Sequence, residues 1–400
     1  MASKFVLLTA MARYFTPSDV GIYGLMVVTI ANCVMLAGMQ FFLYANRSLA
    51  AAAPRAGLVA VTIRNQFVFY GLLYLLVLPL FLWVFVTGAL PWPLAVWFYS
   101  LVVVEHISYE LQRILANLAR PIRSNVIHTI RTGVWVYLLL ALILGAPSLR
   151  DVRTLWCCWL AGSLASVALG LYWLRNLEWA SVWRTPVDWP WIKSGCVTTL
   201  HYIPTTLVLF LSTTVDRYTL DHFVGKPSVG AYTFFASVTN VVVSFPEAGI
   251  ATVMVPQIIS AFAEGRFQEH ARLLKDFARK LAWSIVLTSA GAILAVLLAL
   301  EYYVREPIYK ASLNAFWLLL LSSGLTTLSL WPHHSLYSRN LDKPLVGVGL
   351  IAVVPFIILN LTLIPRFGIM GAACAALTMQ AIMFLGKLAL SRRFVVQQQP

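Results

Sequence analysis

The stretch at residues 212–232 reads STTVDRYTLDHFVGKPSVGAY and lies just past the middle of the chain. It places four charged residues between two long apolar runs, namely Asp216, Arg217, Asp221 and Lys226. Each flanking run is long enough for a membrane-spanning helix, which needs about 20 mostly apolar residues. The stretch therefore predicts a polar junction between two such helices.

A weaker copy of this junction lies near the N-terminus. There PSDVGIY at residues 17–23 parallels KPSVGAY at residues 226–232, and in both places Val-Gly-x-Tyr opens an apolar helix. Four matching residues can recur by chance, but the apolar context on both sides favours a repeat. The copies begin halves of similar length, and membrane transporters built from repeats bind their substrate between them. We therefore expect two homologous helical bundles around one central cavity.

The composition is that of an integral membrane protein. Hydrophobic residues make up 60% of the chain and charged residues 11%, with a mean hydropathy of +0.80. Soluble domains average about 45–50% apolar residues and about 25% charged residues. The net charge of +14 does not indicate nucleic-acid binding, because the basic residues lie in short loops between apolar runs. The cysteines are Cys33, Cys157, Cys158, Cys196 and Cys374, and all lie in apolar segments. Their spacing is not that of a zinc site, so we predict no metal and no cofactor.

Hydropathy predicts an all-α polytopic fold of about twelve transmembrane helices. The expected spans are 1–15, 21–45, 66–87, 92–113, 124–145, 154–174, 196–216, 229–250, 281–301, 313–337, 345–364 and 368–390. The first span would reach only about 22 Å at 1.5 Å per residue, against about 30 Å of hydrocarbon. It is either a partial span, or the true start lies upstream of Met1.

Basic residues set the predicted orientation. With both termini in the cytoplasm, 20 lysines and arginines fall on the inner side and 8 on the outer side, with Arg131 inside a helix. Inner loops are the basic ones, so this orientation is favoured. We expect an N-terminal six-helix bundle at 1–174, an interfacial linker at 175–195, a C-terminal six-helix bundle at 196–391 and a cytoplasmic tail at 392–400.

One inner segment, at residues 257–280, is longer than a turn. It mixes apolar residues such as Phe262 and Phe277 with Arg266, Arg272 and Arg279. This pattern is typical of a basic amphipathic helix lying on an anionic membrane leaflet, with an ordinary solvated loop as the alternative.

Several blocks together resemble a known family. They are RYFTPSDVGIYG at 13–24, DRYTL at 216–220, VGAY at 229–232, KPL at 343–345 and NLTLIPRFGIMGAA at 360–373. The chain resembles the polysaccharide-export branch, in particular the O-antigen flippases, of the multidrug/oligosaccharidyl-lipid/polysaccharide exporter superfamily. It departs from that pattern in its short first helix, and it ends after twelve spans where similar peptidoglycan-precursor flippases usually carry two more.

The resemblance implies a V-shaped cationic cavity and an ion-coupled, alternating-access flippase in the bacterial inner membrane. The implied substrate is an oligosaccharide on undecaprenyl diphosphate, an O-antigen-type unit for lipopolysaccharide biosynthesis, moved from the inner to the outer leaflet. A polysaccharide polymerase and a chain-length regulator are candidate partners.

Ionisable residues inside the spans are the candidate site, because such residues are costly in a membrane and commonly serve function. As substrate-binding residues we predict Arg131, His128, His201, Arg217 and His333, and as ion-coupling residues Glu105, Asp216 and Glu247. Arginine suits phosphates because its planar fork binds two oxygens. The alternative is that these residues form interhelical hydrogen bonds that hold the bundle together.

Two of these predictions concern pairs. Glu105 and Arg131 fall at nearly the same depth of consecutive helices, so we expect them to pair, directly or through His128. We expect Asp216 to pair with a basic residue and to help close the outer side.

Two other functions compete with the flippase. A cation-coupled multidrug exporter of the same superfamily would need an acidic cavity, whereas buried basic residues are prominent here. A membrane glycosyltransferase or polymerase would need a carboxylate-bearing extramembrane loop, and the chain contains no Asp-x-Asp motif. We therefore predict no catalytic residues and no enzyme activity.

Overall fold

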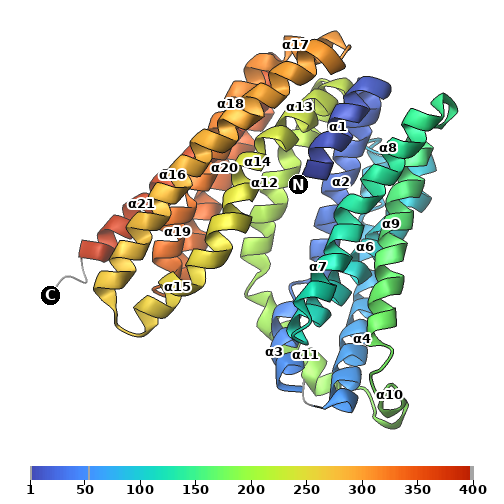
Figure 1. Cartoon of the computed structure of the whole chain (residues 1–400), viewed down its shortest axis with the longest axis vertical. Helices are drawn as coiled ribbons and strands as arrows, with labels where there is room; N and C mark the ends of the chain where they lie inside the picture. Colours follow the sequence, from blue (N-terminus) through green and yellow to red (C-terminus); the bar gives the residue numbers. More distant parts are fainter. Residues whose placement is uncertain (1, 53–54, 397–400) are drawn as a thin grey trace. The chain divides into compact units, whose positions relative to one another are not determined.

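The structure, a computed structural model, describes residues 2–52 and 55–396, and the part it describes contains helices and no strands (Figure 1). Within the described residues, ten helical segments are long and apolar enough to cross a membrane. An eleventh is the pair α11 (Trp189–Leu200) and α12 (Ile203–Phe223), which is bent by 59° at its break. The expected all-α polytopic class is confirmed. The first helix, α1 (Ala2–Tyr14), has 13 residues and is too short to span, as its sequence indicates.

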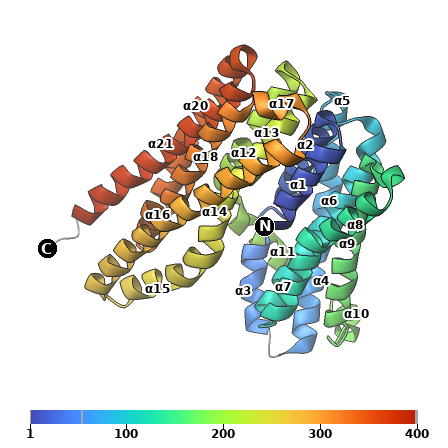
Figure 2. The same cartoon turned by 45° about the horizontal axis from the view of Figure 1, so that its top comes forward.

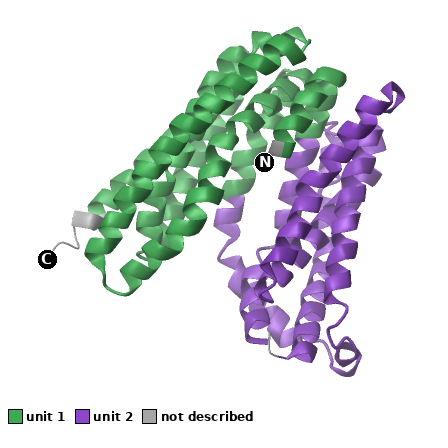
Figure 3. Cartoon of the chain, viewed as in Figure 1, with its two compact units in different colours: residues 1–24, 208–400 green, residues 25–207 purple. Residues whose placement is uncertain are grey.

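The chain forms two compact units (Figure 3). Unit 1 comprises residues 1–24 and 208–400, and unit 2 comprises residues 25–207. The divisions fall inside α2 (Pro17–Gly38) and α12, so two helices contribute residues to both units. These units are defined by packing, whereas the domains expected at 1–174 and 196–391 rest on a sequence repeat and stay a prediction.

Unit 2 is assembled around α6 (Ala95–Asn117) and α9 (Val152–Leu174), which pack along each other. A buried apolar cluster joins them to the neighbouring helices and includes Leu49, Ile63, Leu111, Ile127 and Leu174. Besides parts of α2 and α12, the other helical segments of this unit are α3 (Phe42–Ala52), α4 (Ala56–Leu80), α5 (Trp83–Val86), η1 (Trp92–Leu94), α7 (Pro121–Thr129), η2 (Ile130–Val134), α8 (Trp135–Gly145), η3 (Pro147–Leu149), α10 (Ala180–Arg184) and α11 (Trp189–Leu200).

Unit 1 is built on α20 (Asp342–Phe367), α21 (Ile369–Val396) and α18 (Leu313–Leu328), as Figure 2 shows from a second direction. Val208, Ala352, Phe356 and Ala375 lie in its core. Besides parts of α2 and α12, its other segments are α1 (Ala2–Tyr14), α13 (Lys226–Thr239), α14 (Val241–Pro246), η4 (Glu247–Ala251), α15 (Thr252–Ala263), α16 (Phe267–Leu298), η5 (Ala299–Tyr303), α17 (Pro307–Ala311) and α19 (Leu330–Tyr337).

The two Val-Gly-x-Tyr copies pack against each other within unit 1. A Cβ atom on Gly21 would lie 2.1 Å from the carbonyl oxygen of Lys226, and one on Gly230 would lie 2.2 Å from the carbonyl oxygen of Pro17. In the repeat, Gly21 corresponds to Gly230 and Pro17 to Lys226, so the two contacts are equivalent. Small residues let membrane helices approach this closely. The start of α2 and the start of α13 therefore cross with a local two-fold relation.

Several expected helices differ from the structure, and three of these differences have identifiable reasons. The span expected at 21–45 is broken after Gly38, because Met39 and Gln40 both adopt positive φ angles. The span expected at 196–216 is broken at residues 201–202 and continues to Phe223. The segment at 257–280 is not a separate surface helix, because α15 ends at Ala263 and α16 begins at Phe267, with Gly265 at a φ of 74° between them.

Candidate functional site

Glu105 and Arg131 form a buried ion pair in unit 2. Nη1 of Arg131 on η2 donates to Oε2 of Glu105 on α6 at 2.9 Å, and each side chain is less than 10% exposed. This confirms the pairing expected from their depths, and the contact is direct rather than through His128. Such a pair stabilises a fold little compared with apolar packing, but losing one partner leaves an uncompensated charge and costs about 3–5 kcal/mol.

A third helix completes the shell around Glu105. On α9, Trp159 donates its indole N–H to Oε1 of Glu105 at 2.8 Å, and Ser163 donates its hydroxyl to the same oxygen at 2.6 Å. With the Arg131 contact, the carboxylate accepts three hydrogen bonds. These three donors replace the water that the carboxylate loses on burial, so the charged group is accommodated inside the unit.

The backbone around Arg131 departs from regular helix. Residues 130–134 form a single π-helical turn, η2, between α7 and α8. The indole N–H of Trp135 donates to the carbonyl oxygen of Arg131 at 3.0 Å, and its ring stacks on Trp159 with centroids 5.8 Å apart. Single π-helical turns inside longer helices are frequent at functional sites. Here the turn contains Arg131 itself.

Arg131 keeps hydrogen-bonding capacity that Glu105 does not use. Its Nη2 donates to Oε1 of Gln112 at 3.2 Å, and its Cζ lies 4.4 Å from the centroid of the Tyr109 ring. The Nε atom is buried and has no hydrogen-bond partner among the described residues. A buried guanidinium N–H without a partner is an unsatisfied donor, and a further acceptor reaches it only when the side chains around it move.

A second buried carboxylate, Glu110, lies about one and a half turns further along α6. Its Oε2 accepts from Nε2 of Gln66 at 2.8 Å and from the hydroxyl of Tyr70 at 3.0 Å, and its Oε1 accepts from Nη1 of Arg113 at 2.5 Å. Glu110 has no exposed surface, while the Arg113 side chain is 26% exposed. Sequence reasoning missed this site. The signal was the spacing of His106, Glu110 and Arg113 at i, i+4 and i+7, which places them on one helix face.

Tyr109 connects the two charge networks. The centroid of its ring lies 4.2 Å from the Cζ of Arg113 and 4.4 Å from the Cζ of Arg131. The Cζ of Arg113 also lies 3.5 Å from the centroid of the Phe42 ring. Both arginines interact with aromatic faces, which stabilises a cation in a poorly hydrated setting. Tyr109, Gln112 and Arg113 are each partly exposed, so they form the accessible edge of an otherwise buried cluster.

The two predicted histidines of unit 2, His128 and His201, are exposed. His128 is exposed on α7, and its carbonyl oxygen accepts from Thr132. His201 lies at the break between α11 and α12, where its Nδ1 is 3.3 Å from the carbonyl oxygen of Thr198. Their roles in substrate binding stay predictions.

Asp216 and Arg217 form a second charged site, in unit 1. Nη1 of Arg217 lies 3.6 Å from Oδ1 of Asp216, and Oδ2 of Asp216 accepts from the Tyr232 hydroxyl at 2.7 Å. The expected basic partner of Asp216 is thus its neighbour in sequence. Tyr232 belongs to the repeat copy on α13, so this bond ties the end of α12 to that copy. Closure of the outer side by these residues stays a prediction.

The remaining predicted residues of unit 1 lie apart from this pair. Glu247 is exposed at the first position of the π-helical turn η4. His333 on α19 stacks on Tyr337 with centroids 6.1 Å apart and contacts the neighbouring His334 ring. No group of three metal-ligating side chains occurs within residues 2–52 and 55–396.

The helices and their internal charge pairs define a multi-pass α-helical membrane protein with ionisable side chains paired inside its packed units. No protein-family model and no curated protein matches the sequence.

Solved structures share the fold. One is the inward-facing conformation of a multidrug resistance MATE family transporter of the MOP superfamily, 12% identical, with a TM-score of 0.79 over 99% of this chain and 95% of that one. Another is the lipid II flippase MurJ in an inward closed conformation, 13% identical, with a TM-score of 0.58 over 99% of this chain and 88% of that one. At these identities the likeness establishes a fold like that of MOP-superfamily members.

Proposed function

We propose that this protein is a flippase for oligosaccharide linked to undecaprenyl diphosphate. It moves an O-antigen-type repeat unit from the inner to the outer leaflet of the bacterial cytoplasmic membrane by ion-coupled alternating access, with both termini in the cytoplasm. The polymerase and chain-length regulator that act on such units are its candidate partners. The protein itself performs no covalent chemistry.

The observation that carries this proposal is a difference between the charged groups around Tyr109: the carboxylates have their hydrogen-bond partners, whereas one arginine does not have all of its own. Glu105 and Glu110 each accept three hydrogen bonds, from side chains that include one arginine apiece. Arg131, by contrast, retains a buried N–H without a partner among the described residues. The acids are already neutralised, whereas an arginine can take one more acceptor. A site of this kind favours an anion, and diphosphate oxygens match the guanidinium fork.

The accessible edge of the cluster suits the rest of such a substrate. Arg113 is the more exposed of the two arginines, and Phe42 and Tyr109 lie against it. Aromatic rings can stack on sugar faces while the arginine faces the diphosphate. Arg131 is buried more deeply, and the substrate diphosphate reaches it when the hydrogen bonds of Arg131 to Gln112 and Glu105 break.

The fold is compatible with the proposal without identifying the substrate. One solved structure of this fold is a lipid II flippase and another is a multidrug transporter. A multidrug exporter for cationic drugs needs a carboxylate that is free to meet the drug. Glu105 and Glu110, the two carboxylates of the unit 2 cluster, are both engaged by arginine, so the flippase is the better match.

A deletion of the encoding gene in its host separates these functions. We expect loss of surface polysaccharide, with lipid-linked repeat units trapped on the inner leaflet and restored export on complementation with the wild-type gene. Sensitivity to cationic drugs with normal surface polysaccharide would indicate the multidrug exporter. Repeat units that reach the outer leaflet but are not joined further would indicate the enzyme.

A further inference from the structure

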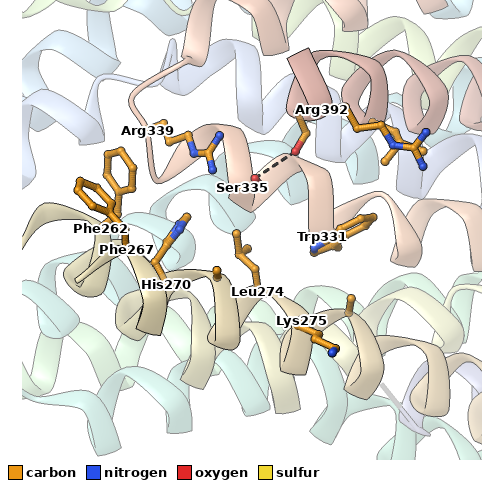
Figure 4. Close-up of a pocket in the computed structure, with 13 residues that line it drawn as sticks. Phe262, Phe267, His270, Leu274, Lys275, Trp331, Ser335, Arg339 and Arg392 are labelled. Carbon is orange, nitrogen blue, oxygen red and sulfur yellow. Dashed lines mark hydrogen bonds between the residues drawn. The ribbon is translucent and has the colours of Figure 1, made fainter. Parts of the chain in front are cut away.

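Unit 1 contains a cavity of about 920 Å³ that the site described above does not include (Figure 4). It lies where α15 and α16 meet α19 and α21, at the end of unit 1 that holds the α15–α16 turn (Figure 1). A hydrogen bond of 3.1 Å between the hydroxyls of Ser335 and Ser391 joins α19 to α21 at one wall. The cavity is of the size that holds a small molecule or part of a lipid.

The lining divides into two chemical kinds. Apolar side chains form most of it, among them Phe262, Phe267, Leu274, Trp331 and Leu388. The charged side chains of the lining are all basic: Lys275, Arg339 and Arg392. An apolar space with only cationic charges matches an amphiphile that carries a negative headgroup.

Arg339 is the most buried of these three cations. Its Nε and Nη1 atoms are buried and have no hydrogen-bond partner among the described residues, and its Cζ lies 5.9 Å from the Phe262 ring. Burial lowers the pKa of Arg339, because the charged form loses hydration. A buried guanidinium of this kind is stabilised when an anion supplies the missing acceptors.

The acidic residues of the α15–α16 turn and the start of α16 are engaged elsewhere, and Asp342 at the start of α20 is exposed and does not line the cavity. Arg266 pairs with both Glu264 and Glu269 in the α15–α16 turn, and Arg279 pairs with Asp276 on α16 at 3.0 Å. None of these five residues lines the cavity. The basic groups of the lining are therefore left for a ligand from outside the chain.

We propose that this cavity binds one anionic phospholipid. Its phosphate accepts hydrogen bonds from Arg339, with Arg392 and Lys275 adding charge, and the upper part of an acyl chain lies along Leu274, Trp331 and Leu388. The start of α16 and the loop after α19 lie on the side that basic loops assign to the cytoplasm. Basic pockets between transmembrane helices on that side match the headgroups of anionic lipids.

Native mass spectrometry of the full-length protein in detergent measures this directly. The ligands are phosphatidylglycerol and phosphatidylcholine of the same chain length, with inorganic phosphate and undecaprenyl phosphate as separate additions. We expect phosphatidylglycerol to bind about tenfold more tightly than phosphatidylcholine. Both lipids carry the phosphate, but phosphatidylcholine adds a quaternary ammonium cation, which the basic lining repels. Inorganic phosphate should not compete at millimolar concentration, because it gains nothing from the apolar lining.

Two variants and one control test the location. Arg339→Gln should weaken binding of both phospholipids and lower the preference for phosphatidylglycerol, because it removes a donor to the phosphate and one of the three cations. Ala278→Leu, which keeps every charge but narrows the cavity, should weaken binding of both phospholipids without changing the preference. Arg279→Gln is the matched control, because Arg279 carries the same charge, is 68% exposed and does not line the cavity.

The proposal is overturned by any of four results. These are equal binding of the two phospholipids, competition by inorganic phosphate, binding of undecaprenyl phosphate alone, or an equal loss in Arg279→Gln and Arg339→Gln. If Arg339→Gln fails to fold, normal phosphatidylglycerol binding by the Ala278→Leu variant would overturn it.

Discussion

Arg131 combines two roles that a single substitution cannot separate, since it neutralises Glu105 and carries a free N–H. Replacing it with alanine should abolish flipping. It also leaves a buried carboxylate without its cation, which costs stability of about 3–5 kcal/mol. Arg131→Lys should keep part of the activity, because lysine supplies the charge without the planar fork. The measurement is flipping of lipid-linked oligosaccharide in reconstituted vesicles.

The double variant Glu105→Gln with Arg131→Gln is the control for this prediction. It removes both charges together, so it should restore much of the thermal stability that Arg131→Ala loses. If Arg131 binds substrate, the double variant remains inactive although it is folded. Wild-type flipping by the double variant would show that the pair is structural only.

Glu105 is the residue on which ion coupling is proposed to depend. Protonation of its carboxylate would weaken its bond to Arg131 and release the arginine toward the diphosphate. Glu105→Gln mimics the protonated form, so we expect flipping that no longer responds to a pH gradient. Glu264→Gln, in the exposed α15–α16 turn, should respond like the wild type. A normal pH response of Glu105→Gln in the vesicle assay would rule out this coupling mechanism.

Helix crossings provide a test at the scale of elements. Gly21 and Gly230 each face a backbone carbonyl oxygen at a distance that a Cβ atom cannot occupy. Gly21→Ala and Gly230→Ala should each lower the midpoint of thermal unfolding in detergent. The effects should be non-additive in the double variant, because one separation of α2 from α13 relieves both contacts.

Gly291 is the matched control for this crossing. A Cβ atom added to Gly291, in α16, would meet no neighbouring atom within 4 Å, so Gly291→Ala should be neutral or stabilising by up to about 1 kcal/mol. An equal loss of stability at Gly291 and Gly21 would show that helix propensity, and not the crossing, determines the result.

Some elements were accessible from the sequence and others were not. Hydropathy was enough to find most of the spans and the depth at which Glu105 meets Arg131, because both follow from the rise per residue and the bilayer thickness. The break after Gly38 and the π-helical turn at residues 130–134 were not accessible. Gly38 and Gly133 lie at these features, but a lone glycine in an apolar run is a weak signal, and no proline accompanies it.

Glu110 was missed for a related reason. A carboxylate near the inner end of a span is expected to be interfacial, and its burial depends on Gln66 and Tyr70 from α4, more than one helix away in sequence. The repeat was accessible as a pattern, whereas the contact between its two copies was visible only once α2 and α13 were placed together in unit 1.

Topology is a prediction for the whole molecule. Ser148 and Asn176 are both exposed and flank the two ends of α9 (Val152–Leu174). In a background without native cysteines, a cysteine placed at residue 148 should react with an impermeant thiol reagent added outside cells, and one at residue 176 should react only after lysis. Removing the native thiols is necessary, since Cys157 is exposed. The reverse pattern would contradict the cytoplasmic placement of the termini.

The most direct test of the proposed function uses the purified wild-type protein in liposomes. One set of vesicles carries fluorescent oligosaccharide on undecaprenyl diphosphate, and the other is given a cationic dye with an imposed ion gradient. We predict translocation of the lipid-linked oligosaccharide well above protein-free vesicles, with no accumulation or export of the dye. Transport of the dye, with the lipid-linked oligosaccharide remaining in its original leaflet, would contradict the account.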